Sequence, residues 1–226
     1  MDTSVASQFY NAIGVPSKCD PNSEESRFAV DPIFPQLSRT IKPGMRVLDL
    51  GCGAGRYAFV AEELGAVPVG IDCAAVPLEH ARQVAQERGS YARFVEGDYC
   101  ALPFPPSSFD AAIFINNIVE CSYDDIDTLL RQLQVILVPD GLLLLTMPDK
   151  FHQHQQGGKS LAIYDPSTGK ADRVCYTADD GEEFQYQSYF WTVFFARYVC
   201  SRYMTLCEEE ILESGGRWFV FKNSRP

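Results

Sequence analysis

Three closely spaced glycines, Gly51, Gly53 and Gly55, follow a short apolar stretch that contains one acid, Asp49. Glycines let the backbone turn tightly, with positive φ where needed, and let a ligand touch the main chain. The free N–H groups at the start of the helix that follows favour an anionic group such as a carboxylate. A buried Asp49 needs a donor or a cation, which N–H groups of the turn or a ligand ammonium would supply. The pattern therefore indicates a ligand site at this turn.

The spacing of these glycines differs from that of dinucleotide-binding proteins. Their fingerprint is GxGxxG, and its second half supports a pyrophosphate. Here the spacing is GxGxG, with Arg56 where the third fingerprint glycine would stand. A nicotinamide-dependent oxidoreductase would also use a glycine turn and an acid such as Asp72. It remains an alternative, although the spacing counts against it.

Further polar residues follow the later apolar stretches. Asp72 stands roughly 20 residues after the glycine turn, where related folds place an acid that binds ribose hydroxyls. Asn116 and Asn117 follow the fourth apolar stretch, and the carboxyl ends of strands form the ligand crevice in such sheets. Glu120 is a candidate general base or a partner for a cationic amine. It is equally explained as a solvated acid near a helix start.

Strand and helix patterns alternate around these residues. Strands that alternate with helical segments of about ten residues indicate βαβ units and a mostly parallel sheet. The apolar runs do not alternate with polar residues, which is typical of strands buried on both faces. The expected strands span 46–50, 67–71, 92–95, 111–115 and 142–147, with helices over 57–64, 77–88 and 126–136 and a turn at 139–141.

Residues 47–56 read VLDLGCGAGR and resemble the first motif of the class I, Rossmann-like S-adenosylmethionine-dependent methyltransferases. The resemblance covers roughly residues 45–147. It implies a three-layer α/β sandwich with a seven-stranded, mostly parallel sheet in the order 3-2-1-4-5-7-6 and one antiparallel C-terminal strand. It also implies S-adenosylmethionine as the cofactor and S-adenosylhomocysteine as the product.

The resemblance assigns cofactor contacts to individual residues. In the family, the first acid and the glycine turn hold the methionine end, which carries over to Asp49. Asp72 would bind the ribose, and Asp98 would accept the adenine amino group. Cys73 and Tyr99 would lie beside the adenine ring. The full expected set is Tyr10, Asp49, Gly51, Cys52, Gly53, Asp72, Cys73, Asp98, Tyr99 and Asn116.

The acceptor side offers fewer signals. Glu120 and His154 are the candidate catalytic groups, and Asn117, Tyr189 and Trp191 are candidates for acceptor binding. Many relatives carry histidine where this chain has Glu120, which puts a histidine-based mechanism there in doubt. A base is needed only if the acceptor is protonated at working pH. No Cys or His spacing suits zinc, so no metal is expected.

The composition of the chain limits the kinds of acceptor and partner that we expect. The formal net charge of -11 argues against a broad phosphate-binding surface and nucleic acid. We expect a small-molecule O or N acceptor, and a protein or peptide acceptor remains open. The 8 cysteines include no CxxC pair, and the N-terminus lacks the pattern of a secretory signal, so we expect reduced thiols and a cytoplasmic location. The apolar runs fall short of the roughly 18–20 residues of a membrane span. The oligomeric state stays open.

The chain divides into an N-terminal helical cover (1–44), a cofactor-binding core (45–147), an acceptor-binding insertion or lid (148–203) and a C-terminal hairpin that completes the sheet (204–226). A further hairpin is expected around 178–181, and a helix over 190–203. Besides the oxidoreductase, an aminopropyl transferase and a catalytically silent cofactor-binding or partner-binding protein remain open.

Overall fold

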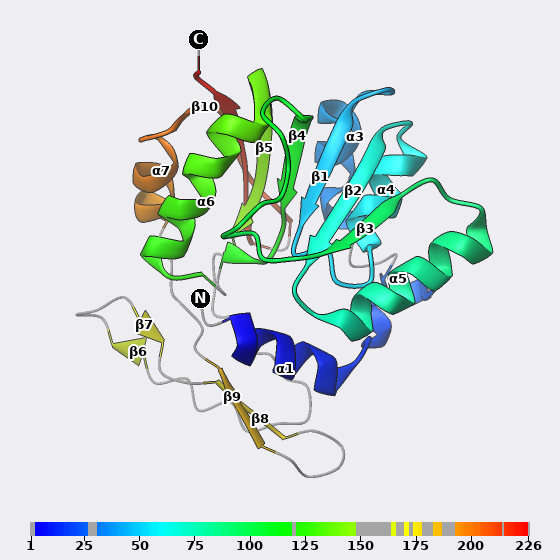
Figure 1. The fold of residues 1–226 in the computed structure, drawn as a ribbon. Helices are drawn as coiled ribbons and strands as arrows, with labels where there is room; N and C mark the ends of the chain where they lie inside the picture. The colour runs from blue at the N-terminus through cyan, green and yellow to red at the C-terminus, as the bar shows by residue number, and fades with distance from the viewer. Residues whose placement is uncertain are drawn as a thin grey trace.

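The computed structural model describes residues 3–26, 31–118, 121–147, 164–165, 170–171, 174–177, 183–186, 193–213 and 215–225. Its centre is a seven-stranded sheet in the order β10-β11-β5-β4-β1-β2-β3 (Figure 1). The strands are β1 (Arg46–Leu50), β2 (Val67–Asp72), β3 (Arg93–Glu96), β4 (Phe109–Phe114), β5 (Leu137–Met147), β10 (Met204–Ile211) and β11 (Arg217–Asn223).

Strands β1 to β5 run parallel, whereas β11 lies antiparallel between β5 and β10. With the C-terminal pair numbered 6 and 7, this is the order 3-2-1-4-5-7-6, so the predicted fold class is confirmed. Strand β1 pairs with β2 on one side and β4 on the other, which makes the β1/β4 boundary the point where the strand order reverses. Ligands of open α/β sheets bind outside the carboxyl ends of the strands at such a point.

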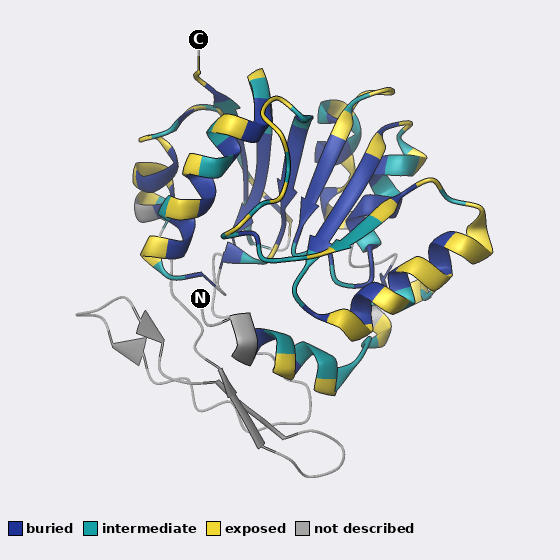
Figure 2. Ribbon diagram, viewed as in Figure 1, coloured by how far each residue is buried: buried dark blue, intermediate teal, exposed yellow. Residues whose placement is uncertain are grey.

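Helices cover both faces of the sheet. Alternate side chains of β1 divide between the two sides: Val47 packs in one cluster with residues of α3 and α4, and Leu48 in another with residues of α6 and α7. The buried positions run along most of the central strands β1, β2 and β4 (Figure 2), as expected for a sheet covered on both faces. The helices are α3 (Phe34–Thr40), α4 (Arg56–Glu63), α5 (Ala75–Arg88), α6 (Tyr123–Ile136) and α7 (Val193–Cys200).

The N-terminal segment begins with α1 (Thr3–Ile13), which lies against α5 and contacts β9 (Figure 1). The strands that flank the expected hairpin turn pair antiparallel as β8 and β9, while the turn itself, 178–181, lies outside the described residues. Among the described helices, none has the length and apolar content that a bilayer span requires. The remaining elements are the 3-10 helices η1 (Ser17–Cys19) and η2 (Asp31–Ile33) and the strands β6 (Tyr164–Asp165), β7 (Lys170–Ala171), β8 (Val174–Thr177) and β9 (Glu183–Tyr186).

The expected turn at 139–141 is instead a bulge inside β5. Phe109 of β4 pairs with Leu137, yet Ala111 pairs with Leu142, so β5 carries extra residues between these two pairs. Asp140 takes a φ of 63° within the bulge, and Gly141 has no room for a Cβ, which would lie 2.9 Å from a backbone oxygen. Asp140 and Gly141 therefore have the conformation and the small size that the bulge requires, and the bulge bends a continuous strand rather than ending it.

Helix α6 begins three residues before its predicted start, because a capping box precedes its first apolar residue. The Asp125 N–H donates to Ser122 Oγ at 3.2 Å, and the Ser122 N–H donates to Asp125 Oδ2 at 2.8 Å. We expect Ser122→Ala to lower the free energy of unfolding by about 1 kcal/mol. Urea denaturation measures this. Ser38→Ala on the surface of α3 is the control, and an equal loss there would contradict the capping argument.

Candidate active site

The glycine turn leaves β1 at the carboxyl edge of the sheet. Gly51, Gly53 and Gly55 have φ values of 65°, 51° and 85°, a region that side chains disfavour. A Cβ at Gly55 would lie 2.7 Å from the ring of Phe94, whereas one at Gly53 would meet no atom within 4 Å. Cys52 is buried, and burial raises the pKa of its thiol, so it acts as a packing residue. The open space beside the main chain lies at Gly53.

Asp72 joins this turn to the end of β2. Its Oδ2 accepts the Gly53 N–H at 2.8 Å, and its Oδ1 accepts the Ala74 N–H at 2.9 Å. Burial raises the pKa of the carboxyl, although these N–H donors oppose the shift. The Cys73 N–H also acts on this carboxylate, which has about four lone-pair sites, so Asp72 can hold the two turns and keep acceptor capacity for ligand hydroxyls.

Asp49 lies on β1, the strand next to the one that ends in Asp72. Its side chain is 2% exposed and is on the side of β1 that faces α4. Burial raises its pKa to about 7; the Ala58 N–H and the Arg56 charge lower it, and the Asp72 charge raises it. Its Oδ2 is buried without a hydrogen-bond partner among the residues that the structure describes. Such an atom calls for a donor. A ligand that brings an ammonium group to the turn, as the methionine end of S-adenosylmethionine does, fits this requirement.

The turn between β2 and α5 is tied to α1. Ser7 Oγ donates to the Cys73 carbonyl at 2.9 Å. Asn11 Oδ1 accepts the Val76 N–H at 2.8 Å, in the first turn of α5, whose own N-cap residue supplies no side-chain bond. Tyr10 lies between them in sequence, partly exposed, with its ring edge-to-face against that of its buried neighbour. The N-terminal helix is therefore fixed beside the expected adenosine side.

The turn after β3 carries Asp98 and Tyr99. Asp98 is partly exposed, and its Oδ1 accepts the Cys100 N–H at 2.7 Å. Tyr99 is 8% exposed; its hydroxyl contacts Cys121 Sγ at 3.1 Å, and its ring packs edge-to-face on Phe114. Asp98 is thus available to a ligand, while most of Tyr99 belongs to the core.

The two asparagines after β4 have different partners. Asn116 has a φ of 61°, and its N–H donates to Thr146 Oγ1 on β5 at 2.9 Å. Asn117 turns the other way, and its Nδ2 donates to the Leu50 carbonyl on β1 at 2.7 Å. Both residues lie beside the point where the strand order reverses, and Asn117 reaches the glycine turn itself.

A protein-family model, described as the methyltransferase domain, matches residues 47–141, which contain the glycine turn, Asp72, Asp98 and both asparagines. Residues 47–141 form a methyltransferase domain. The PH0226 protein of Pyrococcus horikoshii OT3 superposes with a TM-score of 0.80 and 24% identity, over 96% of this chain and 98% of that one. This likeness shows a shared fold.

Two curated relatives match the methyltransferase domain. Ribosomal protein L11 methyltransferase of Thermus thermophilus is 38% identical over 112 residues, which cover 49% of this chain and 41% of that protein. Demethylmenaquinone methyltransferase of Thermus thermophilus is 38% identical over 106 residues, or 46% of this chain and 47% of that protein. The chain thus spans less than half the length of either relative.

The methyltransferase domain brings together most of the residues that its sequence singled out. Asp72 and Asn117 both bond the glycine turn, and the Asp72 charge acts on Asp49. Four of the predicted positions lie outside the described residues: Glu120, His154, Tyr189 and Trp191.

Sequence reasoning missed Ser7, Asn11 and Cys121. Ser7 and Asn11 share one face of α1 at i, i+4 spacing, which was a signal available beforehand. Their partners on α5 and its preceding turn were not, since they lie more than sixty positions away in sequence. Cys121 reads as an ordinary buried thiol, and its place between Tyr99 and Asn117 depends on the fold.

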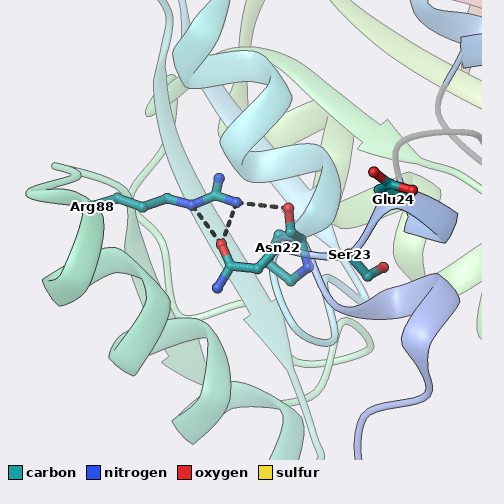
Figure 3. Close-up of a pocket in the computed structure, with 5 residues that line it drawn as sticks. Asn22, Ser23, Glu24 and Arg88 are labelled. Atoms are coloured by element: carbon teal, nitrogen blue, oxygen red, sulfur yellow. Dashed lines mark hydrogen bonds between the residues drawn. The ribbon is translucent and has the colours of Figure 1, made fainter.

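A pocket of about 290 Å³ lies at the far end of α5 (Figure 3), lined by Pro21, Asn22, Ser23, Glu24 and Arg88. The Arg88 guanidinium donates to the Pro21 carbonyl and twice to Asn22 Oδ1. Arg88 is about 20 Å along α5 from the turn that holds Asp72. The pocket is therefore separate from the methyltransferase site, and its arginine fastens the N-terminal segment to α5.

Proposed function

We propose that the chain is an S-adenosylmethionine-dependent methyltransferase that acts on a small-molecule O or N acceptor. The observation that carries the proposal is the buried Asp49 oxygen, which has no partner among the described residues and lies on the strand that leads into an open glycine backbone. A ligand ammonium would satisfy that oxygen. A dinucleotide offers a pyrophosphate anion at the equivalent turn instead, and the buried carboxylate would repel it.

When bound, S-adenosylmethionine supplies a methyl group on a sulfonium, a good leaving centre for an in-line displacement. The protein contributes orientation. Asp49 would hold the ammonium end, and Asp72 would accept the ribose hydroxyls. Asp98, in the turn after β3, would accept a hydrogen bond from the adenine amino group. Fixing both reactants removes the entropy of bringing them together and accounts for much of the expected acceleration.

The acceptor is proposed from charge. A net charge of -11 disfavours polyanionic acceptors. The two relatives are named for different acceptors, ribosomal protein L11 and demethylmenaquinone, at the same 38% identity, so neither name carries over to this chain. We place the acceptor beside the carboxyl end of β4, close to Asn117 and, next in sequence, Glu120. Segment 148–203, with His154, Tyr189 and Trp191, is the proposed lid, except for α7 (Val193–Cys200), which packs in the core beside α6.

Calorimetric titration of the purified chain tests the cofactor. We expect micromolar binding of S-adenosylmethionine and of S-adenosylhomocysteine, and no binding of NADH. NADH binding without the other two would establish the nicotinamide alternative. Preference for the decarboxylated donor would indicate an aminopropyl transferase. No binding of any of them would contradict the proposal.

Transfer is a separate measurement. Methyl-labelled S-adenosylmethionine is incubated with the enzyme and a panel of small alcohols, phenols and amines, followed by mass spectrometry of the products. Label in a small-molecule product is the expected result. Label in protein instead would overturn the acceptor class. Cofactor binding without transfer to the panel, to added protein or to RNA would indicate a silent binding protein.

A further inference from the structure

The side-chain amide of Asn117 bridges the junction between β1 and the glycine turn. Its Nδ2 donates to the Leu50 carbonyl at 2.7 Å and to the Gly51 carbonyl at 3.3 Å. An amide nitrogen carries two hydrogens, so both donors are used within the protein. Asn117 therefore holds two successive peptide groups at the point where the chain leaves the sheet.

Gly51 makes room for this amide. A Cβ at Gly51 would lie 2.7 Å from Asn117 Nδ2, closer than real Cβ contacts allow. The space above the Gly51 Cα is thus filled by Asn117, in contrast to Gly53, where a Cβ would meet nothing within 4 Å. The first glycine of the motif accommodates a side chain of the protein, and the second leaves the backbone open to a ligand.

The contact continues from Asn117 to the turn after β3. The Cys121 thiol, on a side chain buried from solvent, lies 3.6 Å from the Asn117 carbonyl oxygen and donates to it. The Tyr99 hydroxyl lies 3.1 Å from the same sulfur. Gln132 of α6 completes the series, because its Nε2 donates to the Tyr99 carbonyl at 3.2 Å. We call Asn117, Cys121 and Tyr99 the inner brace.

We propose that Asn117 is a positioning residue, and that the inner brace holds the glycine turn and the Asp98–Tyr99 turn in one fixed arrangement before any ligand binds. These are the turns that would contact opposite ends of the cofactor, so the functional side of this inference rests on the proposed function. A site already ordered loses less conformational entropy on binding and binds more tightly. The two ends of the site are then coupled through Asn117 and the buried side chains of Cys121 and Tyr99.

Hydrogen exchange of the ligand-free protein, followed by NMR, tests the brace. The N–H groups of Gly51 and Cys52 donate to the Ile71 carbonyl at 2.8 and 3.1 Å and report directly on the turn. Asn117→Asp keeps the shape but turns a carboxylate oxygen toward two carbonyls. We expect it to raise the exchange rate of these two amides about tenfold above any global change.

Asn223→Asp is the matched control. Asn223 is 1% exposed, and its Nδ2 donates to the carbonyls of Gln134, Leu137 and Val138 at the opposite edge of the sheet. The Asn223→Asp variant replaces an amide that donates to main-chain carbonyls by a carboxyl group, as Asn117→Asp does, but away from the candidate active site. We expect it to leave the Gly51 and Cys52 amides at the rate set by global stability. An equal increase at these amides in both variants would overturn a specific role for Asn117.

Tyr99→Phe tests the far end of the brace with a milder change, and remains informative if Asn117→Asp does not fold. We expect it to raise exchange at Gly51 and Cys52 about threefold. Tyr91→Phe is its control, because the Tyr91 hydroxyl donates to the Ala66 carbonyl at 3.1 Å outside the brace. Increased exchange in Asn117→Asp alone would overturn the link to Tyr99, and unchanged exchange in both variants would overturn the brace.

Titration with S-adenosylhomocysteine then separates the inference from the proposed function. We expect Asn117→Asp to bind it about tenfold more weakly than wild type, and Asn223→Asp to bind it normally. If wild type does not bind it, the proposed function fails, but the exchange data, recorded without ligand, still decide the brace. Normal affinity in a variant with fast exchange would overturn the claim that the brace prepares the site.

Discussion

Asp72→Ala is expected to weaken the binding of S-adenosylhomocysteine about 100-fold or more, the largest loss of any single substitution in the site. The carboxylate would lose two charge-assisted hydrogen bonds to ribose hydroxyls, each worth about 1.5–3 kcal/mol. It would also release the Gly53 N–H, which donates to Asp72 Oδ2 at 2.8 Å and fixes the turn. Calorimetry measures the affinity, and thermal unfolding verifies that the variant is folded.

Asp110→Ala is the control for this variant. Asp110 also accepts a backbone N–H and lies in an ion pair, both with Arg46, but at the start of β1, away from the carboxyl edge. We expect normal binding there. Titration with adenosine and with methionine locates the effect within the ligand. The loss of affinity in Asp72→Ala should appear with adenosine and be small with methionine. Undiminished affinity for S-adenosylhomocysteine in a folded Asp72→Ala would contradict the ribose assignment.

The sequence was most informative where local pattern and chemistry agree. Strand β1 was predicted to the residue, because Gly44 and Gly51 bound a short run rich in β-formers. Helix α6 was predicted from its apolar residues and so began late, although Ser122 and Asp125 have the spacing of a capping box. The sheet order came from the resemblance, since periodicity carries no information on which strands are neighbours.

The sequence did not predict the features that depend on contacts between distant parts of the chain. Asn117 was predicted to bind the acceptor because it follows a strand end; no pattern shows that its amide reaches a turn 66 residues earlier. Asn11 likewise bonds an N–H of α5 across 65 residues. The position of a polar side chain relative to a site was predictable from the sequence, but its hydrogen-bond partner was not, because the partner is set by packing.

Asp49 has opposite consequences for binding and for stability. The ordinary pKa of the carboxyl is 3.8, and burial raises it to about 7 in the folded protein. Below pH 3.8 the group is protonated in both states and has no effect on stability. Between these values the unfolded chain ionises while the folded one keeps its proton, so stability falls as pH rises, and above 7 the full penalty applies. Three pKa units correspond to about 4 kcal/mol.

Asp49→Asn is therefore expected to make the protein more stable and less able to bind its ligand. The amide avoids the buried charge, but its NH₂ group lacks a partner, which costs about 1–3 kcal/mol, so the net gain at pH 8 is about 2 kcal/mol. At pH 4 the buried charge is absent and the unpartnered amide remains, so the gain should turn into a loss of about 1–2 kcal/mol. S-adenosylhomocysteine should bind about 100-fold more weakly, because the ammonium faces a neutral amide instead of a buried carboxylate. Urea denaturation at both pH values and calorimetry at pH 8 measure the two effects.

The pH dependence of binding identifies the group responsible. Wild type must lose the Asp49 proton to receive an ammonium, so its affinity should rise about tenfold per pH unit up to pH 7 and then level off. Arg56 and Asp72, the charged groups that act on Asp49, shift this midpoint in opposite directions. Asp49→Asn should lose most of the slope and retain only what Asp72 contributes. If Asp49→Asn kept the wild-type slope and affinity, the unpaired oxygen would not be the ammonium partner, and the choice of S-adenosylmethionine over a dinucleotide would lose its structural basis.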